Sequence, residues 1–213
     1  TLLSAIATVA GGQINTFKNH QELQQRLLSS LQLASEIIDR RNGALPPGRA
    51  SRVAGSARMI ADCMGLPDDQ MELITAAAFL AAMMSGRREP VSLMETLPED
   101  RLFDEKINAS LMTRLENLPG MGDVFRIIQH RNENFDGSGT PSALCGNAIP
   151  LGSRIIRAVL FLEDIDLADS DLLEHALKRF TGSILDPMVA RAIRQCATRL
   201  IERYKAEREP NME

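Results

Sequence analysis

The residues whose types and spacing could carry chemistry gather in one stretch, residues 130–154. It opens with HRNE at 130–133, continues as DGSGTP at 136–141 and resumes as IPLGSR at 149–154. Histidine and carboxylates can ligate a metal ion, and glycine amides flanked by arginines can hold a phosphate. Three glycines and a proline within ten residues cannot lie inside a helix, so we predict a sharply turned loop. Loops held between rigid elements are common places for function.

The elements that position this loop are predicted to be helices. Apolar residues make up 44% of the 213 residues, with one Tyr and no Trp. Ala, Leu, Ile and Met dominate them, and these residues favour helices over strands. We therefore predict an all-α fold, a helical bundle that is interrupted by the glycine-rich loop. The chain is long enough for one domain that buries its own core.

Apolar residues at helical spacing locate the individual helices. The expected helices cover residues 23–38, 53–64, 68–81, 91–97, 104–118, 151–162, 172–180 and 187–201. The third begins at Asp68 or Asp69 and is apolar nearly all round, so it should be a buried central helix. The last opens at Asp186-Pro187 and should run unbroken into a polar tail that frays.

The two ends of the chain are expected to differ from its middle. Because the chain opens on Thr and not Met, we interpret residues 1–22 as a linker or the end of an upstream domain. Residues 23–205 should form the helical domain, and residues 206–213 a flexible tail. The apolar stripe of residues 23–38 either packs on the domain or joins two protomers into a homodimer.

Charge, hydropathy and cysteine content exclude several classes of function. The net charge is −4 with no block of Lys or Arg, which disfavours a nucleic-acid partner. The apolar run at residues 2–10 is shorter than the ~20 residues that a membrane span requires and lacks a preceding basic region, so neither an anchor nor a signal peptide is predicted. Cys63, Cys145 and Cys196 lie far apart and suggest neither a zinc site nor a disulfide framework, as expected in the reducing cytoplasm.

The loop and the residues after it resemble the signature of the HD-GYP family, which usually reads HHExxDGxGYP and then IPLxARI. The similarity extends to residues 52–66, 76–80 and 182–189, which resemble the family's RV…A…GL, AAxLHDIGK and GxxFDPxxV segments. The resemblance implies an all-α, HD-domain-like bundle in a bacterial signalling protein such as a response regulator. Active members hydrolyse the second messenger cyclic di-GMP with two or three ions, usually iron or manganese.

This chain departs from the family at the positions that hold those metals. The residues found there are Arg49, Ala81, Ala82, Arg131, Asn132 and a residue near Phe161. A methyl group cannot ligate a metal, and a guanidinium places a fixed positive charge where a cation would bind. His130 is one residue early, which on a helix turns it by about 100°. We therefore predict no metal, no cofactor and no catalytic residue.

Two functions of different class stay open for such a domain. The first is a catalytically inactive module, the output domain of a larger regulator, that acts by protein–protein interaction. Its partner would be a diguanylate cyclase or an upstream sensor or receiver domain. The second is a sensor that binds cyclic di-GMP without hydrolysing it, and a minor alternative is an active phosphodiesterase with a rearranged site.

The residues proposed to bind a ligand or partner lie in or beside the loop and just before the second helix. They are Arg49, Arg131, Asp136, Gly137, Gly139, Thr140, Pro141 and Arg154. The arginines could hold phosphate oxygens or form salt bridges, and Arg49 could pair with Glu36, Asp39 or Glu133. Thr140 replaces the family's Tyr. The glycine turn is either required by the fold alone or retained as a recognition surface.

Overall fold

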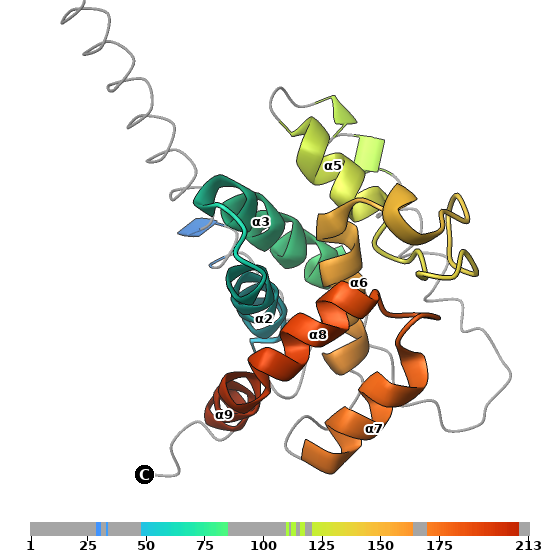
Figure 1. Cartoon of the computed structure of the whole chain (residues 1–213). Coiled ribbons are helices and arrows are strands. Elements are labelled where there is room, and N and C mark those ends of the chain that lie inside the picture. Colours follow the sequence, from blue (N-terminus) through green and yellow to red (C-terminus); the bar gives the residue numbers. More distant parts are fainter. Residues whose placement is uncertain are drawn as a thin grey trace, which may run out of the picture.

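A computed structural model of the chain describes residues 29–30, 33, 48–84, 110, 112–113, 116–117, 121–163 and 170–208. The elements are α2 (Arg49–Cys63), α3 (Asp68–Met84), α5 (Gly122–Gln129), the 3-10 turn η1 (Gly146–Ala148), α6 (Leu151–Glu163), α7 (Ser170–Phe180), α8 (Pro187–Gln195) and α9 (Ala197–Arg208). Figure 1 shows their arrangement. Within these residues the only β pairing is a single bridge between Thr181 and Leu185. The all-α prediction is confirmed.

Helices α2 and α3 form the centre of the bundle. They are joined by a short turn in which Gly65 has a φ of +71°, a conformation that favours glycine. Both helices are rich in buried alanine, so their backbones approach closely. Helix α3 is buried along most of its length, as its apolar sequence predicted. The C-terminal end of α3 and the N-terminal end of α2 are thereby brought to the same side of the molecule.

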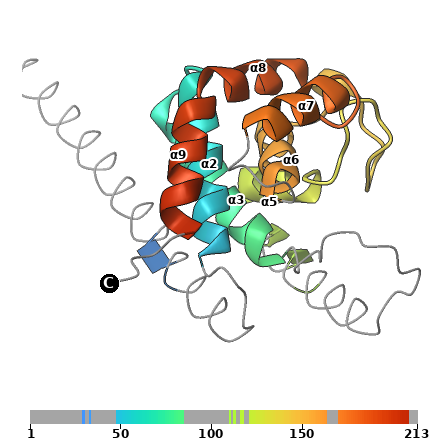
Figure 2. The same ribbon diagram turned by 90° about the horizontal axis from the view of Figure 1, so that it is seen from below.

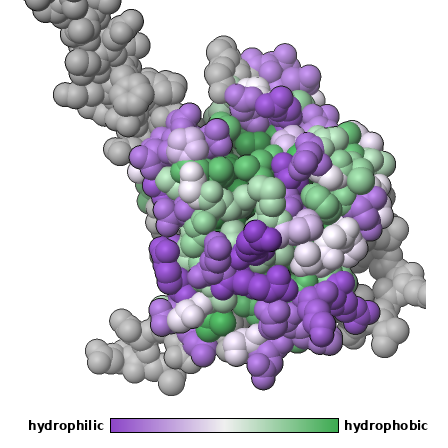
Figure 3. Space-filling model, in the orientation of Figure 1, coloured by the Kyte–Doolittle hydropathy of each residue, from purple (hydrophilic) through white to green (hydrophobic). Residues whose placement is uncertain are grey.

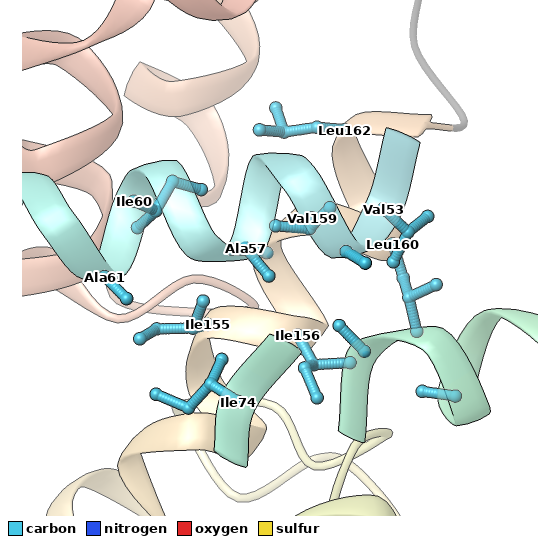
Figure 4. Close-up of a cluster of buried hydrophobic side chains, with 14 of the residues drawn as sticks. Val53, Ala57, Ile60, Ala61, Ile74, Ile155, Ile156, Val159, Leu160 and Leu162 are labelled. Carbon is cyan, nitrogen blue, oxygen red and sulfur yellow. The ribbon is translucent and has the colours of Figure 1, made fainter. Parts of the chain in front are cut away.

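Helix α6 packs across α2 and α3 and completes the core. In Figure 4, Ile155 and Ile156 of α6 lie between Ala57 of α2 and Ile74 of α3. All four side chains are buried. Their packing supplies apolar burial worth roughly 1.5–3 kcal/mol for each fully buried large side chain. The core therefore fixes the three helices from which most of the candidate site is built.

Helices α5 and α6 form a rigid frame for the glycine-rich loop between them. A Cβ at Gly152 would lie 2.7 Å from Cδ1 of Ile127, so glycine is needed for this close approach. The buried hydroxyl of Ser153 donates a hydrogen bond to the Ile127 carbonyl at 2.8 Å. Pro150 immediately precedes α6, as expected for its first turn. The two ends of the loop are therefore held in fixed positions.

The predicted single last helix is wrong, because the structure has two. Helix α8 ends at Gln195, and Cys196 leaves helical geometry with φ −107° and ψ 13° before α9 begins. The bend turns α9 back along α2, and Figure 2 shows the two helices side by side. The Arg203 guanidinium there lies over Gly55 and donates to the Ser51 carbonyl at 3.4 Å. Helix α9 extends to Arg208, beyond the predicted start of the tail.

Several sequence predictions fall wholly or largely outside the described residues. The predicted helix at 91–97 lies outside them, and those at 23–38 and 104–118 are represented by a few residues, all helical except Asn117, which lies in a turn. Leu33, on the first of these, is 62% exposed. On the face seen in Figure 3, apolar side chains gather over α3 and the start of α6, while polar side chains follow α8. In the described part of the chain, no helix combines the length and the apolar character that crossing a membrane requires.

Candidate functional site

The start of α2 and the end of α3 meet at three of the positions where the HD-GYP family has metal ligands. Arg49 is the first residue of α2, and its guanidinium Nη1 donates a hydrogen bond to the carbonyl oxygen of Ala82 at 3.0 Å. Ala81 is fully buried and Ala82 nearly so. The juxtaposition that the resemblance implies is therefore present in this fold. The Arg49 guanidinium bridges from α2 to α3, and the side chains of Ala81 and Ala82 are methyl groups.

On α6, Leu160 and Phe161 lie at or next to the expected position, and their side chains point in different directions. The Phe161 ring packs edge to face on Phe180 of α7, with ring centroids 5.0 Å apart. Leu160 is buried and lies beside Val53 of α2 in Figure 4. Because neighbouring residues of a helix point about 100° apart, Leu160 and not Phe161 faces α2. Both side chains are apolar, so neither can ligate a cation.

The residues at the start of the loop turn their polar groups toward the protein. The Arg131 guanidinium Nη1 donates to the Ile128 carbonyl at 2.9 Å. Burial lowers the pKa of Arg131 from its ordinary value, because it disfavours the charged form. Asn132 is exposed, and its carbonyl accepts the Thr140 amide at 3.2 Å. His130 Nδ1 lies 3.5 Å from a carboxylate oxygen of Glu133.

Glu133 is the buried residue that closes the loop. Its side chain is 0% exposed, although it carries a carboxylate. One oxygen accepts the Ser142 amide at 2.7 Å, and the other accepts the Leu144 amide at 3.2 Å. The carboxylate therefore joins the beginning of the glycine turn to its end. Glu133 was one of the predicted partners of Arg49, but its carboxylate oxygens bind the loop amides. The other two predicted partners, Glu36 and Asp39, lie outside the described residues.

The glycine turn has a geometry that only glycine allows. A Cβ at Gly139 would lie 2.2 Å from the backbone nitrogen of Asn134 and 2.5 Å from Cα of Glu133. Real Cβ atoms do not approach backbone so closely, so any side chain here would force the loop open. Gly137 has a φ of +85°. The two glycines are thus required for the shape of the turn, whatever its function.

Asp136 orders the exposed tip of the turn. Its carboxylate Oδ1 accepts the Ser138 amide at 2.9 Å. Hydrogen bonds from the Ser138 side chain and then its backbone lower the pKa of Asp136 below its ordinary value. The turn therefore presents an ionised carboxylate at neutral pH. Thr140 and Pro141 are exposed beside it.

Backbone contacts fix the loop to the segment between α7 and α8. The amide of Asp136 donates to the Ser183 carbonyl at 2.9 Å, and that of Phe135 donates to Ile184 at 3.3 Å. Farther along, the Gly146 amide donates to the Phe135 carbonyl at 2.8 Å. These bonds and the Glu133 carboxylate hold the loop from within. It is an exposed surface of defined shape.

Arg154 occupies a structural position at the edge of the loop. Its guanidinium Nη1 pairs with the carboxylate of Asp186 and donates to Asn147 Oδ1 at 3.0 Å. The other oxygen of Asp186 accepts the Met188 amide at 2.6 Å and so caps α8. The paired side chains are 11% and 2% exposed, so the salt bridge is largely buried. Of the two roles considered for Arg154, the structure shows the salt bridge.

The residues present do not fit the iron or manganese ions that the resemblance implies. Among the described residues, no group of three or more His, Cys, Asp or Glu side chains is arranged to hold a metal ion. At the positions themselves, Arg49 contacts the Ala82 carbonyl, and the side chains of Leu160 and Phe161 on α6 are apolar. Iron and manganese need imidazole and carboxylate ligands. The side chains at these positions therefore offer neither ion a ligand of the kind it needs.

The all-α bundle with a glycine turn between two helices defines the class of protein, an HD domain. The HD domain model matches residues 32–171, and the chain belongs to this family. The chain is similar to the cyclic di-GMP phosphodiesterase response regulator RpfG of Xanthomonas campestris pv. campestris (strain 8004), with 29% identity over 144 residues. The match covers 63% of this chain and 37% of the relative, so the chain spans little more than a third of that protein's length. The resemblance to a cyclic di-GMP phosphodiesterase is thereby confirmed.

Two buried carboxylates with structural roles were not found from the sequence. One is Glu163, which lies 3.5 Å from the Arg52 guanidinium, with both side chains less than a tenth exposed. The other is Asp186, whose capping role the Asp-Pro pair predicted but whose pairing with Arg154 it did not. No local pattern marks either pair, because the partners lie far apart in the sequence.

Proposed function

We propose that this HD domain is catalytically inactive and acts in cyclic di-GMP signalling by binding another protein. The similarity to a cyclic di-GMP phosphodiesterase response regulator supports the signalling pathway. The chain matches little more than a third of that relative, which fits a module of a larger regulator. The partner would be a diguanylate cyclase, or a sensor or receiver domain of the same regulator.

The observation that carries the proposal is the hydrogen bond from Arg49 to the Ala82 carbonyl. Metal-assisted phosphodiester hydrolysis needs cations to generate hydroxide from water and to neutralise the phosphoryl oxygens. Here a guanidinium lies where cations would be held, and the neighbouring side chains are methyl groups. Losing a group that merely supports a metal ligand costs about 10–100-fold in metal affinity, so losing the ligands themselves should abolish binding.

The surface proposed to bind the partner is the loop of residues 136–148. Most of its side chains are exposed, yet its backbone is held by Glu133 and by the segment between α7 and α8. A surface fixed before binding loses little conformational entropy when a partner docks. None of the contacts that hold this loop requires a metal, so its shape survives the loss of catalysis.

A hydrolysis assay tests the proposal. The purified chain, supplied with Mn²⁺ or anaerobic Fe²⁺, is expected to convert no cyclic di-GMP above the rate of a protein-free sample with the same metal. The Xanthomonas relative, assayed alongside, is the positive control. Turnover that requires the added metal and disappears with a chelator would contradict the proposal.

One observation favours the second candidate, a cyclic di-GMP sensor without hydrolysis. Among the described residues, the Nε atom of Arg131 has no hydrogen-bond partner, and this cation lies beside the glycine turn. It could bond a phosphate oxygen. Calorimetry separates the candidates: a Kd of about 1–10 µM that is lost in Arg131→Ala but kept in Arg126→Ala would establish the sensor. If cyclic di-GMP gives no binding heat with the unmodified chain, the sensor function is excluded and the protein-binding function stands.

A further inference from the structure

Two of the three cysteines lie together in the folded chain, although they are far apart in sequence. Cys63 is the last residue of α2, and Cys196 is the residue at the bend between α8 and α9. Cys196 belongs to the buried core, and Cys63 is partly buried and packs against that core. Next to them, the Asp62 carboxylate lies 3.7 Å from the Arg199 guanidinium, which independently brings the end of α2 against the start of α9. The third cysteine, Cys145, is exposed on the glycine-rich loop.

The two thiols differ in their environment. Cys196 is 1% exposed and packs in the core, whereas Cys63 is partly exposed. Burial, and then the hydrogen bond and charge interaction with Cys63, raise the pKa of Cys196 to about 12. The Cys196 thiol is therefore protonated at neutral pH and is a poor first nucleophile. A soluble oxidant reaches Cys63 first, and Cys196 is placed to react second.

We propose that Cys63 and Cys196 are a redox-active pair that forms an intramolecular disulfide when the protein meets a peroxide. The Cys63 sulfur attacks one peroxide oxygen, the O–O bond breaks, and water leaves with formation of a sulfenic acid. The Cys196 sulfur then attacks the sulfenic sulfur, the S–S bond forms, and a second water leaves. In total, two thiols lose two hydrogen atoms, and one hydrogen peroxide is reduced to two waters.

The disulfide would tie the C-terminal end of α2 to the junction of α8 and α9. These elements are separated by more than half of the chain, so the bond closes a long loop in the unfolded state. Cross-links that close long loops give the largest stabilisation in the chain-entropy model. Because the end of α2 already lies against the start of α9, the bond needs little rearrangement of the backbone. The pair is independent of the proposed function and of any partner.

Mass spectrometry of the oxidised protein tests the proposal. The chain is treated with hydrogen peroxide, alkylated, and digested without reductant. The expected product is a pair of peptides linked through Cys63 and Cys196, lighter by two hydrogen atoms than the sum of the free peptides, with Cys145 alkylated. The melting temperature is expected to rise by about 5–10 °C and to return after reduction.

Single substitutions provide the controls. Cys63→Ser should abolish both the linked peptide and the rise in melting temperature, and because Cys63 is partly exposed this variant should fold. Cys196→Ala gives a second variant that tests the buried partner, and Cys145→Ser should leave both results unchanged. Recovery of Cys63 and Cys196 as separate alkylated or further oxidised thiols, or a link of either one to Cys145 alone, would overturn the proposal.

Discussion

Asp186→Ala is expected to lower the free energy of unfolding by about 3–5 kcal/mol. The substitution removes the cap of α8 and leaves the guanidinium of Arg154 without its carboxylate in a largely buried position. Removing one partner of a buried ion pair is strongly destabilising because the remaining charge stays desolvated without an opposite charge to compensate it. Urea denaturation followed by circular dichroism measures the change.

A surface pair in the same protein supplies the matched control for this prediction. Asp123 lies 3.1 Å from Arg126, but both side chains are about two-thirds exposed. Asp123→Ala should therefore change the unfolding free energy by less than about 1 kcal/mol. Asp186→Asn, which can still cap the helix, should fall between the two. Equal effects of Asp186→Ala and Asp123→Ala would show that the Arg154 pair does not join α6 to α8.

Glu133→Ala is expected to destabilise the protein by about 2–4 kcal/mol and to open the glycine-rich loop. The carboxylate accepts the amides of Ser142 and Leu144, and without it both donors lose their partner in a part-buried place. Hydrogen exchange measures the local effect directly. The Ser142 and Leu144 amides should exchange much faster, while amides of α2 and α3 should be affected only through the global stability.

Glu174→Ala is the control for this second change. Glu174 is 59% exposed and lies 3.1 Å from Arg194, so its loss should cost less than about 1 kcal/mol. Glu133→Gln should be intermediate, since its amide oxygen can accept one of the two bonds but its amide nitrogen cannot accept the other. Unchanged exchange at Ser142 and Leu144 in Glu133→Ala would contradict the role given to this carboxylate.

Much of the described fold was predictable because local signals point to it. The apolar stripe of α2, the all-apolar character of α3, and Asp186-Pro187 at the start of α8 each lie within one helix. The break at Cys196 was not predictable, because apolar residues continue at helical spacing through it. What favours the bend is tertiary: it lets α9 return along α2, where Gly55 leaves room for Arg203.

The sequence showed which residue types stand at the candidate site, but it did not show which contacts they make. The resemblance named positions 49, 81 and 82 as ligand positions of the family, and the bond from Arg49 to the Ala82 carbonyl shows that they lie together. It gave the position on α6 only as near Phe161, since Phe161 and Leu160 are equally apolar and no local pattern separates them. The use of Glu133 by the loop depends on amides nine and eleven residues away, which become neighbours only after the turn has folded.

The metal content of the purified chain is the most direct test of whether this domain has lost its ions. The protein is loaded with Mn²⁺ or Fe²⁺, freed of unbound metal and analysed by mass spectrometry of the elements. We expect less than about 0.1 ion per chain, because arginine, alanine and leucine stand where imidazoles and carboxylates would bind. One or more tightly bound ions per chain, lost when Ala82 or its neighbours are substituted, would contradict the claim that this domain has lost its metal ions.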